Sequence, residues 1–250
     1  TTTRSFCTLL VVASMQPQNS GYVRPTGTLP IPQNAAEYRE LLRQVLTCMD
    51  NDTRPLVENT VVRSLRDPAT AFLLVDIINE ASTDDPMSPG IRQLAAVLLR
   101  KRVLTLWRGI GLEEQQQLKS ILLNQMGTEP VRLVRFAIAH VLCVIARVEL
   151  RDGWPELMDA LYAASQAPSV EHRELACVLV HSLARTIADE TGDAGRAAAV
   201  RNVQLAGSVL IAGLSDSEGA VRTAALKAAD ALVPGLAGKG AAKRGIVDEL

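Results

Sequence analysis

Three consecutive basic residues, Arg100, Lys101 and Arg102, interrupt an apolar stretch that runs from Gly90 to Trp107. The apolar residues on both sides keep helical spacing, so the basic residues belong to the same predicted helix. Each residue turns a helix by about 100°, and three successive side chains therefore cover about 200° of its surface. They cannot all point the same way. The chemistry that such a block offers is the attraction of acidic groups.

The charge around this block is unevenly distributed, although the whole chain has a net charge of only -1. Residues 35–90 contain five Arg against ten Asp and Glu, whereas residues 91–151 contain ten Lys and Arg against four Glu. This pattern is consistent with an oriented surface that binds an acidic partner. It is equally consistent with two solvated faces, in which the basic block is hydrated or pairs with Asp84, Asp85 or Glu113.

No arrangement typical of an enzyme is found, and we predict neither a catalytic residue nor a cofactor. Of the three histidines, His140 and His181 lie inside apolar helical patterns and are expected at core or edge positions, and His172 belongs to no catalytic motif. The glycine-rich residues 235–245 follow a helix and lack the spacing of a phosphate-binding loop. The sequence also has no serine in a G-x-S-x-G turn.

The four cysteines, Cys7, Cys48, Cys143 and Cys177, are far apart, and no pair has the spacing of a metal site. Cys143 and Cys177 lie in apolar helical patterns and are expected as small core residues of a protein from a reducing compartment. The basic segment lacks interleaved aromatic residues, so direct binding of nucleic acid is not expected. Apolar runs long enough to span a bilayer are not expected either.

Helices are the elements that must position these side chains. The hydrophobic content is 48% but the aromatic content only 3%, so the core must consist of Leu, Val, Ile and Ala, which favour helices. Beyond Gln33 the apolar period is near 3.6, interrupted by short segments with Pro, Gly or Asp. The sequence predicts helices over about 35–49, 53–66, 69–81, 90–107, 111–126, 129–150, 154–165, 169–190, 193–214 and 217–237, and the last residues begin another.

Every second predicted helix begins with a similar phrase that contains an arginine. The recurring arginines are Arg92, Arg132, Arg173 and Arg222, which lie 40, 41 and 49 residues apart. This interval is typical of HEAT repeats, in which each pair of helices buries its apolar face against the next pair. The predicted fold is all-α: a HEAT-repeat right-handed α-solenoid, that is, a superhelix of antiparallel helix pairs with a concave surface.

Two phrases resemble those of a known family. "IRQLAAVLLRKRVLTLW", residues 91–107, together with "VIARVELRDGWPELMDAL", residues 144–161, is similar to the N-terminal repeats of importin-β-type karyopherins, most of all the importin-4 and importin-5 subgroup. The resemblance extends over about residues 35–187. It implies an importin N-terminal-like module with the first two HEAT repeats at 35–110.

On the same basis, residues 111–250 hold HEAT repeats three to five and the start of a sixth, and the chain is expected to be an N-terminal piece of a longer protein. Residues 1–34 precede the first helix. Their high content of Pro, Gly, Asn and Thr from about residue 16 onward predicts a disordered leader.

The resemblance implies a nuclear import receptor that works in the cytoplasm and the nucleus. Such receptors bind protein cargo, contact Phe-Gly nucleoporins with their outer helices, and release cargo when Ran-GTP occupies the inner helices of the N-terminal repeats. Candidate Ran-binding residues are Arg92, Arg100, Lys101 and Arg135. The alternative is a HEAT-repeat scaffold subunit of a stable assembly, similar to a phosphatase regulatory subunit; neither function requires a metal, a nucleic acid or a membrane.

Overall fold

The computed structural model describes residues 27–80, 85–150, 154–189 and 196–237, and within them every regular element is a helix. All ten predicted helices are confirmed, with ends displaced by three residues or fewer. They are α2 (Ala35–Thr47), α3 (Thr53–Ser64), α4 (Thr70–Asn79), α5 (Ser88–Trp107), α6 (Leu112–Thr128), α7 (Arg132–Glu149), α8 (Pro155–Ser165), α9 (Val170–Asp189), α10 (Arg196–Leu214) and α11 (Gly219–Ala237). The further helix expected after residue 245 lies outside the described residues.

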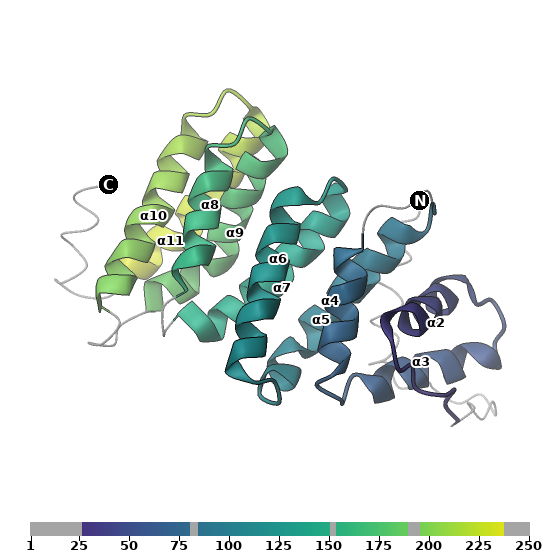
Figure 1. The fold of residues 1–250 in the computed structure, drawn as a ribbon. Helices are drawn as coiled ribbons and strands as arrows, with labels where there is room; N and C mark the ends of the chain where they lie inside the picture. Colours follow the sequence, from purple (N-terminus) through teal and green to yellow (C-terminus); the bar gives the residue numbers. More distant parts are fainter. Residues whose placement is uncertain (1–26, 81–84, 151–153, 190–195, 238–250) are drawn as a thin grey trace, which may run out of the picture.

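The helices from α4 onward form two layers, as Figure 1 shows. Helices α4, α6, α8 and α10 stack in one layer, and α5, α7, α9 and α11 stack in the other. At each of the three junctions between successive repeats, the odd-numbered helices pack more closely on one another than the even-numbered helices do. A stack curves toward the side on which its members are closer together. The odd-numbered helices therefore form the inner layer of the solenoid, as a HEAT-repeat architecture requires.

A single apolar core runs through the stack between the two layers. Each inner helix contributes a stripe of aliphatic side chains with helical spacing, which in α5 includes the buried Ile91, Leu94 and Leu98. Neighbouring pairs extend the same cluster without a break as far as Leu236 near the end of α11. Since no pair could bury its stripe alone, the repeats depend on one another for stability.

Local sequence signals determine where several helices begin. The Asn34 side chain accepts a hydrogen bond of 2.9 Å from the Glu37 backbone N–H and so caps α2. At the start of α6, the Glu114 carboxylate accepts a bond of 3.0 Å from the backbone N–H of Gly111. Pro155 begins α8, where its missing N–H costs nothing. These signals explain why the ends of the helices were predictable from the sequence.

Residues 27–33 lead into α2 without regular structure and lie beside α3. The backbone N–H of Leu29 donates to the Thr60 hydroxyl at 2.7 Å, and the Asn59 side chain donates to the carbonyl of Gly27 at 3.2 Å. This part of the predicted leader is therefore tied to the first repeat. Residues 1–26 of the predicted leader lie outside the described residues.

The segment Ala197–Leu214 of α10 is long and apolar enough, by length and composition alone, to cross a membrane. It contradicts the expectation that no apolar run reaches that length. Core helices of soluble proteins pass the same test, and 44% of this segment is buried. Its buried side chains, which include Val203, Ala206 and Val209, belong to the common core.

Gly213 allows α10 to approach its neighbours closely. A Cβ atom at this position would lie 2.6 Å from the Cys177 Sγ of α9 and 2.9 Å from the Ala225 Cβ of α11. Both distances are shorter than van der Waals contact. Position 213 therefore needs a residue without a Cβ atom, so that the fourth and fifth repeats can stack.

We predict that Gly213→Ala destabilises the chain, because overpacking a tight core typically costs about 1–3 kcal/mol. Gly127→Ala is the matched control: it also lies in a helix, but a Cβ there has no neighbour within 4 Å. The control should be neutral or more stable by up to about 1 kcal/mol, since alanine favours helices. Urea unfolding followed by circular dichroism measures both, and equal behaviour of the two variants would contradict the close approach.

Candidate partner-binding surface

An arginine in the first turns of an inner helix joins its own repeat to the next. In α7, the Arg135 Nε donates to the carbonyl of Glu129 at 2.9 Å, and its Nη2 donates to the carbonyl of Pro130 at 3.2 Å. Its Nη1 reaches the Glu171 carboxylate of α9 at 2.8 Å. One guanidinium group thus holds the turn before its helix and the beginning of the next inner helix.

The same arrangement recurs one repeat later. Arg173 donates to the carbonyls of Ala167 and Pro168 at 3.1 and 2.8 Å, and it forms a two-pronged ion pair with Asp216 at 2.6 and 3.2 Å. Arg222 in α11 likewise donates to the carbonyls of Asp216 and Ser217, which stand six and five positions before it, the same offsets as for Arg135 and Arg173. Arg135, Arg173 and Arg222 are therefore the equivalent positions.

This equivalence corrects one part of the predicted repeat. Arg132, which the sequence phrase aligned with Arg173 and Arg222, instead extends over the surface and pairs with both carboxylate oxygens of Glu174 at 3.0 and 2.9 Å. It also lies over the Phe136 ring, with 4.6 Å from the guanidinium carbon to the ring centre. The three-residue difference arises because the phrase "VRLVR" contains two arginines, and only the second has a side chain directed at the preceding turn.

A third ion pair, one repeat before that of Arg135, is the most deeply buried of the three. Arg92 of α5 and Glu129, at the turn between α6 and α7, form an ion pair in which the two side chains are 1% and 0% exposed. The other oxygen of Glu129 accepts a bond of 2.9 Å from the backbone N–H of Val131. We refer to the pairs Arg92–Glu129, Arg135–Glu171 and Arg173–Asp216 as the arginine ladder.

The far ends of the inner helices are joined by a second polar cluster. The Trp107 indole N–H at the end of α5 donates to Glu149 at 3.1 Å, and the Lys119 ammonium of α6 donates to the other oxygen of Glu149 at 2.7 Å. Lys119 also lies 5.1 Å from the ring centre of Trp154. Both tryptophans are buried. The ladder and this tryptophan cluster together hold α5 and α7 at both ends.

The basic block, Arg100 to Arg102, lies on α5 in the inner layer, between the arginine ladder and the tryptophan cluster. Arg100 is half-buried beside His140 of α7, whereas Lys101 and Arg102 are exposed. Partial burial and the neighbouring Arg100 and Arg102 lower the pKa of Lys101. Burial and the nearby Arg100 lower the pKa of His140 as well. Burial is the larger cause in both groups, and the neighbouring cations add to it; an acidic partner would relieve the part that is due to positive charge.

The block has no acidic partner among the described residues. Asp85, one of the acids considered as its partner, forms salt bridges with Arg39 and Arg43 of α2 instead, the first at 3.1 Å. Glu113 forms no ion pair with the block, and Asp84 lies outside the described residues. In the part of the chain that the structure describes, Arg100, Lys101 and Arg102 are therefore free of ion pairs.

The four candidate Ran-binding residues thus fall into two groups. Arg92 and Arg135 are 1% and 3% exposed, and both are held in ladder ion pairs, although the buried Nε and Nη2 of Arg92 have no hydrogen-bond partner. Buried side chains of this kind hold the inner helices in place and offer no surface to a partner. Arg100 and Lys101 lie on the accessible side of α5 and are the two that a partner could reach. Sequence spacing alone did not distinguish these groups, because both consist of arginine or lysine in inner helices.

Several residues that hold the surface together were not anticipated. Glu129, Glu171 and Asp216 follow their ladder arginines by 37, 36 and 43 residues, a signal that the sequence carries but that is weak in isolation. Lys119 and Glu149 showed no signal at all, because their pairing depends on how α6 and α7 stack.

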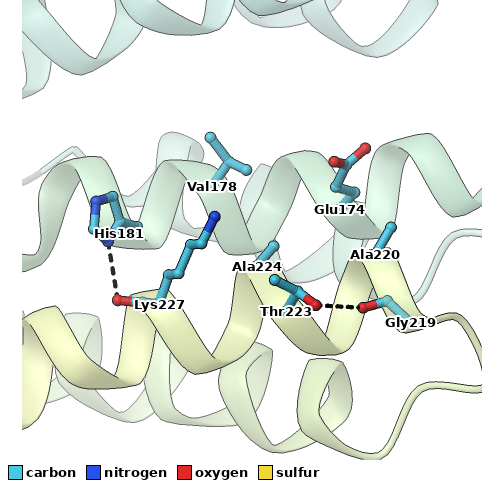
Figure 2. A pocket seen from close by; sticks show the side chains of 8 residues that line it. All are labelled: Glu174, Val178, His181, Gly219, Ala220, Thr223, Ala224 and Lys227. Carbon is cyan, nitrogen blue, oxygen red and sulfur yellow. Dashed lines mark hydrogen bonds between the residues drawn. The ribbon is translucent and has the colours of Figure 1, made fainter.

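A groove of about 470 Å³ opens between α9 and α11, further along the inner layer. Figure 2 shows side chains from both helices facing it. Its residues are Glu174, Val178, His181, Gly219, Ala220, Thr223, Ala224 and Lys227. Small side chains on α11 create the hollow.

The histidines and cysteines show no arrangement for chemistry within the described residues. His140 is half-buried, and His181 is exposed rather than in the core, with its Nδ1 3.0 Å from the carbonyl of Lys227. Cys143 and Cys177 are buried, as predicted, and burial raises their pKa values to about 12 and about 11. Such thiols stay protonated and unreactive at neutral pH. No cluster of three or more His, Cys, Asp or Glu that could hold a metal ion occurs in the described ranges.

Stacked helix pairs that bury one continuous core and are joined by the arginine ladder define the class of HEAT-repeat solenoids. A family model described as "IPO5-like, TPR repeats" matches residues 130–241. Human Importin-4 is 33% identical over 146 residues, which cover 58% of this chain and 13% of that protein.

Solved structures show the same fold. The "Kap95:Nup1 complex" superposes with a TM-score of 0.65 and 20% identity, over 87% of this chain and 26% of the solved one. A second structure, entitled "Kap95p Binding Induces the Switch Loops of RanGDP to adopt the GTP-bound Conformation: Implications for Nuclear Import Complex Assembly Dynamics", matches with a TM-score of 0.56 and 18% identity, over 81% of this chain and 29% of that one. The chain is therefore similar to importins in sequence and to karyopherins in fold, as its motifs predicted, and it spans 13% of the length of its human relative.

We predict that Arg92→Met destabilises the chain by about 3–5 kcal/mol, because it leaves the buried Glu129 carboxylate without its counter-charge. The double variant Arg92→Met/Glu129→Gln should recover much of this loss. Glutamine is neutral and still accepts the bond from the Val131 N–H. Urea unfolding of the two variants measures the difference. A double variant no more stable than the single one would show that the pair does not act through its charge.

The ladder also predicts a specific pH dependence. The hydrogen-bonded guanidinium of Arg173 lowers the pKa of Asp216. A group with a lowered pKa contributes stability that is present above its unfolded value, about 3.9, and that is lost as the pH falls through the folded value. Asp216→Asn should therefore be less stable than the original chain at pH 7, and the difference should shrink below about pH 4. Thermal unfolding at several pH values tests this, and a difference that stays constant with pH would contradict it.

Proposed function

We propose that this chain is part of a nuclear transport receptor, and that the inner face of α5 binds the GTP-bound form of Ran. The observation that carries the proposal is the pair Arg100 and Lys101, which lies accessible on an inner helix and has no ion pair among the described residues. The family of its relatives is one of nuclear transport receptors. The solved neighbour whose title names Ran supports a contact of the same kind here.

The geometry explains how such a surface would work. The ladder and the tryptophan cluster hold α5 and α7 at both ends, so the side chains between them are presented on a rigid support. Arg100 and Lys101 are crowded by like charge, and acidic side chains of a partner would relieve this repulsion. Charges of this kind accelerate association and fix the orientation of the complex.

For a transport receptor, binding must also depend on the nucleotide. A receptor that binds one nucleotide state of Ran better than the other converts nucleotide exchange into cargo release. We further propose that the whole protein carries protein cargo, contacts Phe-Gly nucleoporins with its outer helices, and moves between cytoplasm and nucleus. The neighbour entitled as a complex with Nup1 supports the nucleoporin contact. In this proposal the chain acts by binding and catalyses no reaction. Residues 35–110 form the N-terminal module, and residues 111–250 hold the repeats that follow it.

We predict that Arg100→Glu/Lys101→Glu weakens the binding of Ran-GTP and slows association. The effect should diminish as salt rises, because exposed charges act through screened attraction with a Debye length of about 10 Å at 0.1 M. Calorimetric titrations with Ran-GTP and Ran-GDP at 50 and 300 mM salt measure this. We expect the unaltered chain to prefer the GTP form.

Arg66→Glu/Arg108→Glu is the matched control, since it reverses two exposed charges outside the proposed contact. Both double variants should unfold within about 0.5 kcal/mol of the unaltered chain. Equal affinity for the two nucleotide states would favour a fixed scaffold over a transport receptor. Equal binding by the two double variants at low salt would show that Arg100 and Lys101 do not contact Ran.

A further inference from the structure

The groove between α9 and α11 has a lining that suggests a ligand of defined chemistry. Its two sides come from helices that pack closely, and its apolar lining includes Val178 of α9 and Ala220 and Ala224 of α11. The volume of about 470 Å³ lies in the range in which proteins bind small ligands or a few residues of a peptide. It is partly open to solvent, which suits an extended segment better than a compact molecule.

The acidic residue at one end of the groove is already neutralised. The Glu174 carboxylate accepts two bonds from Arg132 of α7, at 3.0 and 2.9 Å, and in Figure 2 it points away from α11. A ligand would have to displace this two-pronged pair in order to place a cation on Glu174. The groove therefore offers little attraction to a basic ligand.

The other end of the groove carries a positive charge. In Figure 2 the Lys227 side chain extends from α11 toward α9, and its ammonium group forms no ion pair among the described residues. His181 lies beside it and has one ring nitrogen 3.0 Å from the carbonyl of Lys227. A carboxylate bound here would gain an ion pair with Lys227.

We propose that this groove binds a short extended segment of a partner protein in which acidic and aliphatic residues alternate. An aliphatic side chain of the segment lies against the apolar lining that includes Val178, Ala220 and Ala224, and a carboxylate pairs with the Lys227 ammonium. Aliphatic burial supplies affinity, and the charge selects an acidic segment over a basic one. The site lies two repeats beyond the basic block of α5, so it does not depend on the proposed contact with Ran.

The test uses two synthetic peptides and the 250-residue chain labelled at its methyl groups. The acidic peptide is Gly-Ser-Asp-Leu-Asp-Leu-Asp-Ser-Gly, and the basic peptide has Lys in place of each Asp. We expect the acidic peptide to shift the methyl signals of Val178, Ala220 and Ala224 saturably in NMR titrations at pH 7. The basic peptide should bind at least about tenfold more weakly, since it places a like charge beside Lys227.

Lys227→Glu should reverse this preference, and Arg66→Glu, which changes the net charge equally but lies outside the groove, should leave it unchanged. Equal shifts with both peptides, or no shifts at these methyl groups up to millimolar acidic peptide, would overturn the proposal. It would also be overturned if the same methyl signals shifted on raising the protein concentration without peptide, because a second copy of the chain would then occupy the groove.

Discussion

The arginine ladder is the interaction on which the rest of the structure depends. Each repeat buries its apolar stripe only by stacking on the next, and apolar contact is not directional. The ladder supplies the direction: Arg135 and Arg173 each bind two carbonyls of their own turn and one carboxylate of the following repeat. Because these carbonyls and charges are costly to bury unpaired, any slip of one repeat against another would break several strong bonds at once.

The ladder and the tryptophan cluster stabilise opposite ends of the inner helices and leave the middle of the inner layer open. The ends are joined by ion pairs within the chain, such as Arg92–Glu129 and Lys119–Glu149. Polar groups in the middle, among them Arg100, Lys101 and Lys227, remain available. The same scaffold thus presents two positive sites, a crowded one on α5 and a groove between α9 and α11. Both favour acidic partners, but only the groove adds an apolar lining.

The sequence by itself determined the helices and their order. Aliphatic residues at a 3.6 period, with Pro, Gly or Asn at the boundaries, are local signals, and each acts within a few residues of the chain. Asn34, Gly111 and Pro155 begin their helices for reasons that are visible in the sequence. Similar phrases recur every 40 to 49 residues, and with the motifs around Trp107 and Trp154 they predicted a HEAT-repeat solenoid similar to karyopherins.

Only the tertiary structure decided which charged residues are buried. Arg92 and Arg100 lie on the same helix and look alike in sequence, yet one is enclosed against Glu129 and the other lies beside His140 near the surface. The difference depends on residues of the next repeat, 37 or more positions away, and on the angle at which helices stack. The same holds for Arg132 and Arg135, three residues apart, of which only the second reaches the preceding turn. Pairing across repeats is a long-range property that spacing along the chain encodes only weakly.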